Sequence, residues 1–107
     1  MKFYNIAIYT HHSIDINRDD VIILDSSYSL IDSFKAKKDN QEIIFDYLIT
    51  DSLEALSFLG CIIDNGFALT NSSFQTTIEN TFAFGKAINT SISEKETLEE
   101  IFDTIYE

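Results

Sequence analysis

Acidic side chains recur at helical spacing near the end of the chain, and their chemistry is that of a binding surface. Five carboxylates belong to this group: Glu96, Glu99, Glu100, Asp103 and Glu107. All but Glu99 fall within roughly 60° of one another when about 100° is allowed per residue of helix. Like charges four residues apart repel, and Asp103 and Glu107 also oppose the negative end of the helix dipole. A basic partner would offset this repulsion. The alternative is a solvated face that serves solubility.

A second group of acids comprises Asp15, Asp19 and Asp20, which follow the first predicted strand. Loops carried by a rigid sheet are frequent sites of recognition. These aspartates are therefore candidate partner-binding residues as well. The alternative is ordinary loop polarity, because aspartate commonly forms turns.

Metal and nucleophile chemistry has weaker support in the sequence. His11 and His12, with Asp15, carry atoms that metals bind, but adjacent residues of a strand point to opposite faces. Cys61 has no neighbouring signature of an activated thiol, so we interpret it as structural. With only three glycines, the chain has no phosphate-binding loop or dinucleotide fingerprint. We therefore predict no metal, no cofactor and no catalytic residue.

The charge of the whole chain favours a protein partner. A net charge of -11, from 18 acids and 7 bases, repels nucleic acids and anionic membranes and attracts basic proteins. Such binding should weaken as salt rises. The single cysteine excludes an internal disulfide, and the first residues have neither the form of a signal peptide nor the length of a membrane span. We expect a cytoplasmic monomer.

The elements that must position these residues form one predicted domain, residues 1–107. The chain has no proline, no low-complexity stretch and no repeat at which it could be divided. Alternating or β-branched apolar residues predict strands over residues 2–10, 21–24 and 42–50, with a further candidate at 67–70. The strand at 42–50 has the best alternation and should lie centrally.

Helices are predicted in four places. Tyr28, Ile31 and Phe34 recur at helical spacing before a cationic end at Lys38, so 27–38 is predicted helical. Asp51 and Glu54 form a capping-box pattern for a helix over 52–64, which Asn65-Gly66 would end. Residues 73–88 fit either a helix or a strand, and we favour the helix.

The clearest local signal is at the end of the chain. Ser93 and Glu96 form a second capping box ahead of Leu98, Ile101 and Ile105. The prediction is an α+β fold, with a sheet of about three to four strands packed by about three to four helices, ending in this amphipathic helix.

In size, acidity and lack of catalytic motifs, the chain resembles the immunity proteins of contact-dependent growth-inhibition and related polymorphic toxin systems of bacteria. The resemblance covers the whole chain and is one of type, without signature residues. It implies a non-catalytic inhibitor that binds a basic toxin domain, often a nuclease, in the producing cell. The acidic residues named above would then meet the toxin's substrate-binding surface.

Three alternatives remain open from the sequence. Phage-encoded nucleic-acid mimics that inhibit defence nucleases have the same composition. A small metal-dependent enzyme or regulator would use His11 and His12 with nearby acids, and bound divalent metal would support it. A structural subunit would have an exposed apolar patch and would self-associate at high salt.

Overall fold

The computed structural model describes residues 1–107 and is dominated by strands. In chain order the elements are β1 (Lys2–Tyr9), β2 (Val21–Leu24), β3 (Ser29–Asp32), β4 (Lys35–Lys38), β5 (Gln41–Thr50), α1 (Leu53–Leu59), β6 (Ile63–Asp64), β7 (Phe67–Ala68), β8 (Thr81–Ala83), the 3-10 turn η1 (Gly85–Ala87) and α2 (Glu94–Tyr106). The prediction of a three- to four-stranded sheet under three to four helices is therefore wrong. The chain has eight strands and only two α-helices.

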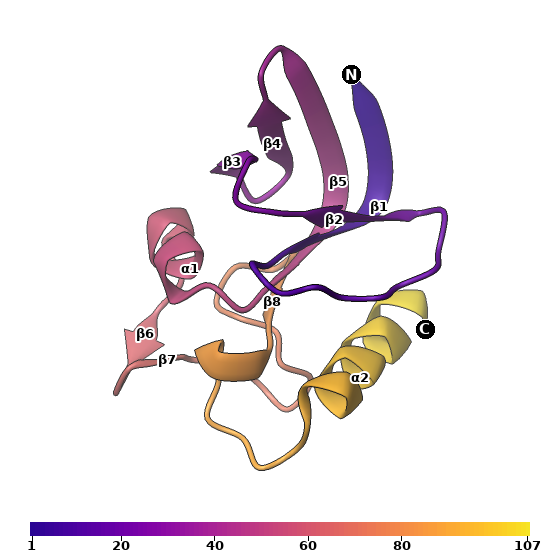
Figure 1. Cartoon of the computed structure of the whole chain (residues 1–107). Coiled ribbons are helices and arrows are strands. Elements are labelled where there is room, and N and C mark those ends of the chain that lie inside the picture. Colours follow the sequence, from indigo (N-terminus) through magenta and orange to yellow (C-terminus); the bar gives the residue numbers. More distant parts are fainter.

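A mixed six-stranded sheet is the frame of the molecule (Figure 1). Its order is β2-β1-β5-β4-β3, and β8 pairs with the last residues of β5, on the edge that β4 leaves free. Strands β2, β1, β5 and β8 run parallel, whereas β3 and β4 form an antiparallel hairpin beside β5. The central position predicted for residues 42–50 is confirmed.

Residues 27–38 form the β3–β4 hairpin instead of a helix. The Asp32 carboxylate accepts a hydrogen bond from the Phe34 backbone N–H, which stabilises the turn. Ile31 and Phe34, whose spacing suggested a helix, are about half exposed, whereas Ala36 is buried. Pairing of β4 with β5, a contact with another part of the chain, gives this segment its structure, which shows why a short periodicity is a weak signal.

Residues 73–88 also form no α-helix. Phe74 has a positive φ of 65°, which a helix does not allow, and the segment ends in β8 and η1. Phe82, Ala83 and Phe84 are all buried, as expected for a short strand inside the fold. Only Thr81–Ala83 form a strand, so neither a helix nor an alternating strand describes the whole of residues 73–88.

Helix α1 is shorter than the predicted 52–64. Its N-cap is Ser52, whose side chain accepts a hydrogen bond from the backbone N–H of Ala55. It ends at Gly60, which has a left-handed φ of 92°. Asn65 and Gly66 instead form the turn between β6 and β7, with φ values of 53° and 82° that suit a tight hairpin.

Helix α2 is present as predicted. Ser93 caps it by accepting a hydrogen bond from the backbone N–H of Glu96 at 3.2 Å. Its side chains Leu98 and Ile101 join buried residues of the sheet, including Ile6, Ile8 and Phe82. Burying these two side chains contributes roughly 3–6 kcal/mol, before the entropy cost, to holding α2 in place. Neither α-helix is long and apolar enough to cross a membrane.

Replacing Ser93 by alanine removes this cap and should lower the free energy of unfolding by about 1 kcal/mol. The loss is expected because the Glu96 N–H would depend on water alone. Urea unfolding measures the change, with Ser91→Ala as the control because Ser91 is exposed and makes no side-chain hydrogen bond. Equal stability of the two variants would contradict the assignment of Ser93 as the cap.

Candidate functional site

The outer side of α2 carries five exposed carboxylates, which we call the acidic face: Glu96, Glu99, Glu100, Asp103 and Glu107. Their exposure follows from the packing of α2, since Thr97, Leu98 and Ile101 on the opposite side are buried. None of the five forms an ion pair within the chain. Lys95 is the only basic residue of α2. The acidic face therefore reaches solvent with its charge uncompensated.

This arrangement weakens the helix that carries it. Three pairs of carboxylates lie four residues apart: Glu96 with Glu100, Glu99 with Asp103, and Asp103 with Glu107. Each pair costs about 0.2–0.5 kcal/mol. No basic residue occupies the last turn, where the helix dipole favours positive charge. The apolar side of α2 and its N-cap therefore stabilise the helix, whereas its surface charges destabilise it.

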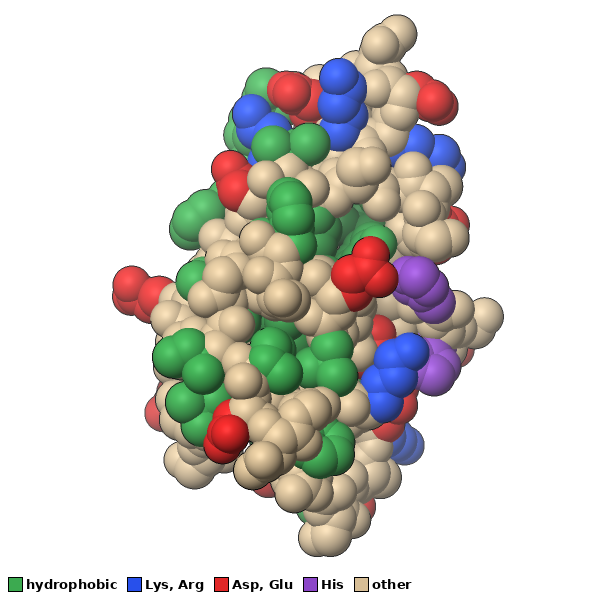
Figure 2. All heavy atoms as spheres, turned by 90° about the vertical axis from the view of Figure 1, so that its left-hand side faces the viewer, with side chains coloured by type: hydrophobic (Ala, Val, Ile, Leu, Met, Phe, Trp, Pro, Cys, Tyr) green, Lys and Arg blue, Asp and Glu red, His purple; other side chains and the backbone are tan.

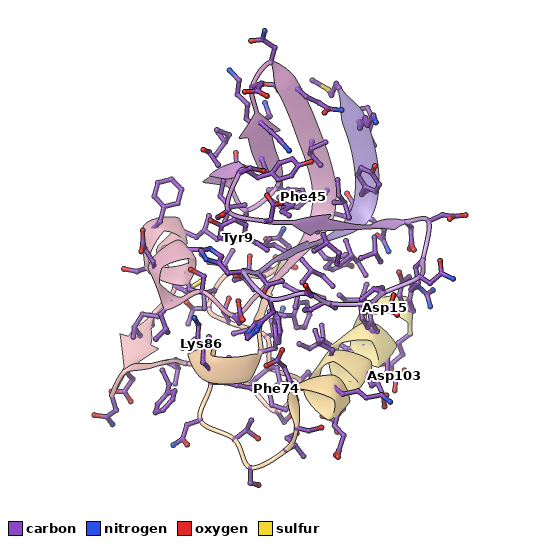
Figure 3. All side chains as sticks on the ribbon, in the orientation of Figure 1. Tyr9, Asp15, Phe45, Phe74, Lys86 and Asp103 are labelled. Carbon is purple, nitrogen blue, oxygen red and sulfur yellow. The ribbon has the colours of Figure 1, made fainter.

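Asp15 lies next to α2, although it is far from it in the sequence. The connection between β1 and β2 passes over the helix, and Asp15 and Asp103 lie on the same side of the molecule (Figure 3). Between this connection and α2 is an open groove of about 420 Å³. The groove is lined by Ile14, Asp15, Ile16, Glu94, Lys95, Leu98, Glu99 and Phe102. The structure thus brings Asp15 together with part of the acidic face.

Asp20 has a different environment from Asp15. Its Oδ2 accepts a hydrogen bond of 2.5 Å from the hydroxyl of Tyr106, and its Oδ1 lies 3.6 Å from Nε of Arg18. The guanidinium of Arg18 lies 4.1 Å from the centre of the Tyr106 ring. Asp20 therefore connects the start of β2 to the last turn of α2. Asp19 is exposed beside it, away from the groove.

The Tyr106 hydroxyl is the main reason why the pKa of Asp20 is lowered, and burial is the main reason why the pKa of Tyr106 is raised. Because the pKa of Asp20 is depressed in the folded state, its stabilising effect is complete above the unfolded value of 3.8 and is lost as pH falls through the folded value.

Tyr106→Phe should lower the free energy of unfolding by less than about 1 kcal/mol, since both groups are partly exposed. The loss should be present at neutral pH and disappear in acid. Urea unfolding across this pH range, with Tyr4→Phe as the control, measures it; a loss that is independent of pH would contradict the assignment.

The two histidines lie in the bend after β1 and contact different neighbours. His11 meets the ring of Tyr9 edge-on at 5.8 Å, whereas Nε2 of His12 lies 3.0 Å from Oδ2 of Asp51. Asp51 is almost fully buried, and Oδ2 makes no well-aligned hydrogen bond even to His12. No group of three or more His, Cys, Asp or Glu side chains is arranged to hold a metal ion.

The sequence pattern assigned Asp51 to a helix cap, but the structure places its carboxylate beside His12. It follows β5 as His12 follows β1, so the parallel pairing of these strands brings the two residues to one edge of the sheet. Gly85 follows β8 at the same edge, and a Cβ atom there would lie 3.1 Å from a carboxylate oxygen of Glu94 and 3.4 Å from Cβ of Asp51. Polar residues directly after buried parallel strands were the signal that sequence reasoning missed.

Cys61 is buried just beyond the end of α1, although the helix predicted over 52–64 would have included it. Its Sγ lies 3.4 Å from the hydroxyl of Thr76, which is also buried. This contact joins the end of α1 to the segment before β8. The arrangement is that of a packed structural thiol.

The face on the opposite side of the molecule from α2 is different in character. Figure 2 shows apolar side chains interspersed there with single charged ones. Exposed apolar residues on the β3–β4 hairpin, α1 and the β6–β7 hairpin are Ile31, Phe34, Phe58, Ile62 and Ile63. This face thus mixes apolar side chains with charged ones of both signs, whereas the acidic face carries carboxylates alone.

The fold and the site together define a small, strongly acidic, strand-rich protein with an exposed acidic helix. No protein-family model matches the sequence, and no curated protein matches it significantly. Among solved structures, the chain is similar to part of a ferredoxin-flavin thioredoxin reductase from Clostridium acetobutylicum, with a TM-score of 0.39 and 14% sequence identity. The similarity covers 96% of this chain and 49% of the reductase chain, so this chain spans about half of that length. A likeness this weak assigns no function.

Proposed function

We propose that this protein is a non-catalytic inhibitor that binds and neutralises a basic toxin domain, of the nuclease class, in the cytoplasm of the producing cell. The observation that carries the proposal is the acidic face, which is exposed and forms no ion pair within the chain. An uncompensated field of this kind speeds the encounter with a positive partner. It also lies on a helix held firmly by the core, which suits a preformed binding surface.

The substrate-binding surface of the toxin would supply the positive charge that complements the acidic face. A nuclease binds phosphates through lysine and arginine side chains, so the surface that it offers to its substrate is basic. Carboxylates along α2 would occupy that surface and exclude the substrate. A nucleic-acid mimic that inhibits a defence nuclease would use the same acidic face, and the identity of the captured partner separates the two.

A metal-dependent enzyme has less support in the structure. His11 and His12 point to different neighbours, and the carboxylate nearest to His12 is buried. Stoichiometric divalent metal in the purified protein would nevertheless revive this alternative.

Affinity capture from native lysate at low salt, followed by elution in salt steps and mass spectrometry, tests the proposal. The expected result is one basic protein in stoichiometric amount, released as salt rises. The captured protein should then degrade nucleic acid when free and lose this activity when the chain is added back. Recovery of a homo-oligomer or of bound metal, with no basic partner, would overturn the proposal.

A further inference from the structure

We propose that the groove between α2 and residues 13–17 binds an extended basic segment of the partner, with one apolar side chain of that segment inserted into the groove. This inference rests on the proposed function and adds the chemistry of the segment that is recognised. The acidic face alone would attract any basic surface, whereas the groove would select among them.

The floor of the groove is apolar. Ile14 and Ile16 come from the connection between β1 and β2, and Leu98 and Phe102 come from α2. All four belong to or pack against the buried cluster beneath α2, so their positions are fixed by the core. The volume of about 420 Å³ lies within the range of about 300–1,000 Å³ that is usual for ligand pockets. A large aliphatic or aromatic side chain has room here.

The rim of the groove is acidic. Asp15 stands on one side, and Glu94 and Glu99 stand on the other, with Lys95 as the only basic residue. None of these three acids forms an ion pair within the chain. A side chain entering the groove would therefore be best flanked by lysine or arginine in its own segment.

The backbone beside the groove is also available. Residues 13–17 are not part of any strand, and none of their backbone groups makes a hydrogen bond within the chain. Buried backbone groups require partners, so a segment that covers this stretch must supply them. An extended partner segment satisfies this requirement, because it can pair with residues 13–17 as an added strand does.

The test uses two short peptides built from lysine, arginine, glycine and serine. They differ only at the central position, which is phenylalanine in one peptide and serine in the other. Titration calorimetry with the full chain should show that the phenylalanine peptide binds at least about tenfold more tightly at the same salt concentration. NMR spectra should show the largest shift differences between the two complexes at Ile14 and Phe102. Equal affinities, or shifts confined to Glu100, Asp103 and Glu107, would overturn the inference.

Two variants distinguish the effect of the rim charges on binding from the effect of net charge. Asp15→Asn with Glu99→Gln removes two rim charges, and Asp39→Asn with Asp64→Asn removes two exposed charges elsewhere. The rim variant should weaken binding of both peptides several-fold more than the control variant does. If the native partner is captured and inhibited while the two peptides bind equally, the groove inference fails and the proposed function stands. If no basic partner is captured, the proposed function fails on its own experiment.

Discussion

Replacing His12 by alanine is expected to lower the free energy of unfolding by about 2 kcal/mol, a large effect for a side chain that is half exposed. The reason is Asp51, whose carboxylate is almost fully buried at the edge of the sheet. His12 is the only side chain within ion-pair distance of this carboxylate, with Nε2 3.0 Å from Oδ2. Its removal takes away this neighbouring polar group and leaves the buried carboxylate more isolated, which is costly in a region of low dielectric.

A double-mutant cycle checks this explanation. Asp51→Asn should restore most of the stability lost in His12→Ala, because the asparagine side chain keeps the volume and removes the charge. His11→Ala is the matched control and should cost less, since His11 is exposed and forms no ion pair with a buried carboxylate. Urea unfolding provides all the free energies. Additive losses from His12→Ala and Asp51→Asn would contradict the coupling.

Neutralising the acidic face should have two opposite effects. We call Glu96→Gln, Glu100→Gln, Asp103→Asn and Glu107→Gln together the face variant. Removing the three like-charge pairs on α2 should raise the free energy of unfolding by about 1 kcal/mol. The same variant should weaken binding of the captured basic partner by at least about tenfold at low salt. Such a stability gain at the expense of binding is typical of a functional surface.

A control variant distinguishes this site from net charge alone. It combines Asp32→Asn, Asp39→Asn, Asp46→Asn and Asp64→Asn, all exposed and none on α2. The change in net charge equals that of the face variant. We expect the control variant to bind within a few-fold of wild type, and thermal or urea unfolding should show no comparable gain in stability. If both variants lost affinity equally, the acidic face would have no special role.

The parts of the fold that sequence could predict were those with strong local signals. The cap at Ser93 and the apolar spacing of α2 act within one helix, and the alternation in β5 identifies a strand by itself. Residues 27–38 were misassigned because Ile31 and Phe34 matched a helical period by spacing alone. Their true environment depends on pairing with β5, which lies beyond the local sequence.

In the candidate site, too, the features within one element could be predicted, whereas the contacts between distant segments could not. The acidic face could be derived from helical spacing, because its members are on one helix. The approach of Asp15 to α2, the attachment of Asp20 to Tyr106 and the pairing of His12 with Asp51 all join distant segments. Such contacts depend on strand order, which the sequence did not provide. The groove was missed for this reason.

The central claim is that the acidic face inhibits a basic partner, and the most direct measurement is a titration of the captured partner's nuclease activity with the purified chain. We predict complete inhibition at equimolar concentration by wild type and by the control variant, and a shift to at least about tenfold higher concentration for the face variant. Full activity of the partner in the complex, or equal inhibition by the face variant, would contradict the claim.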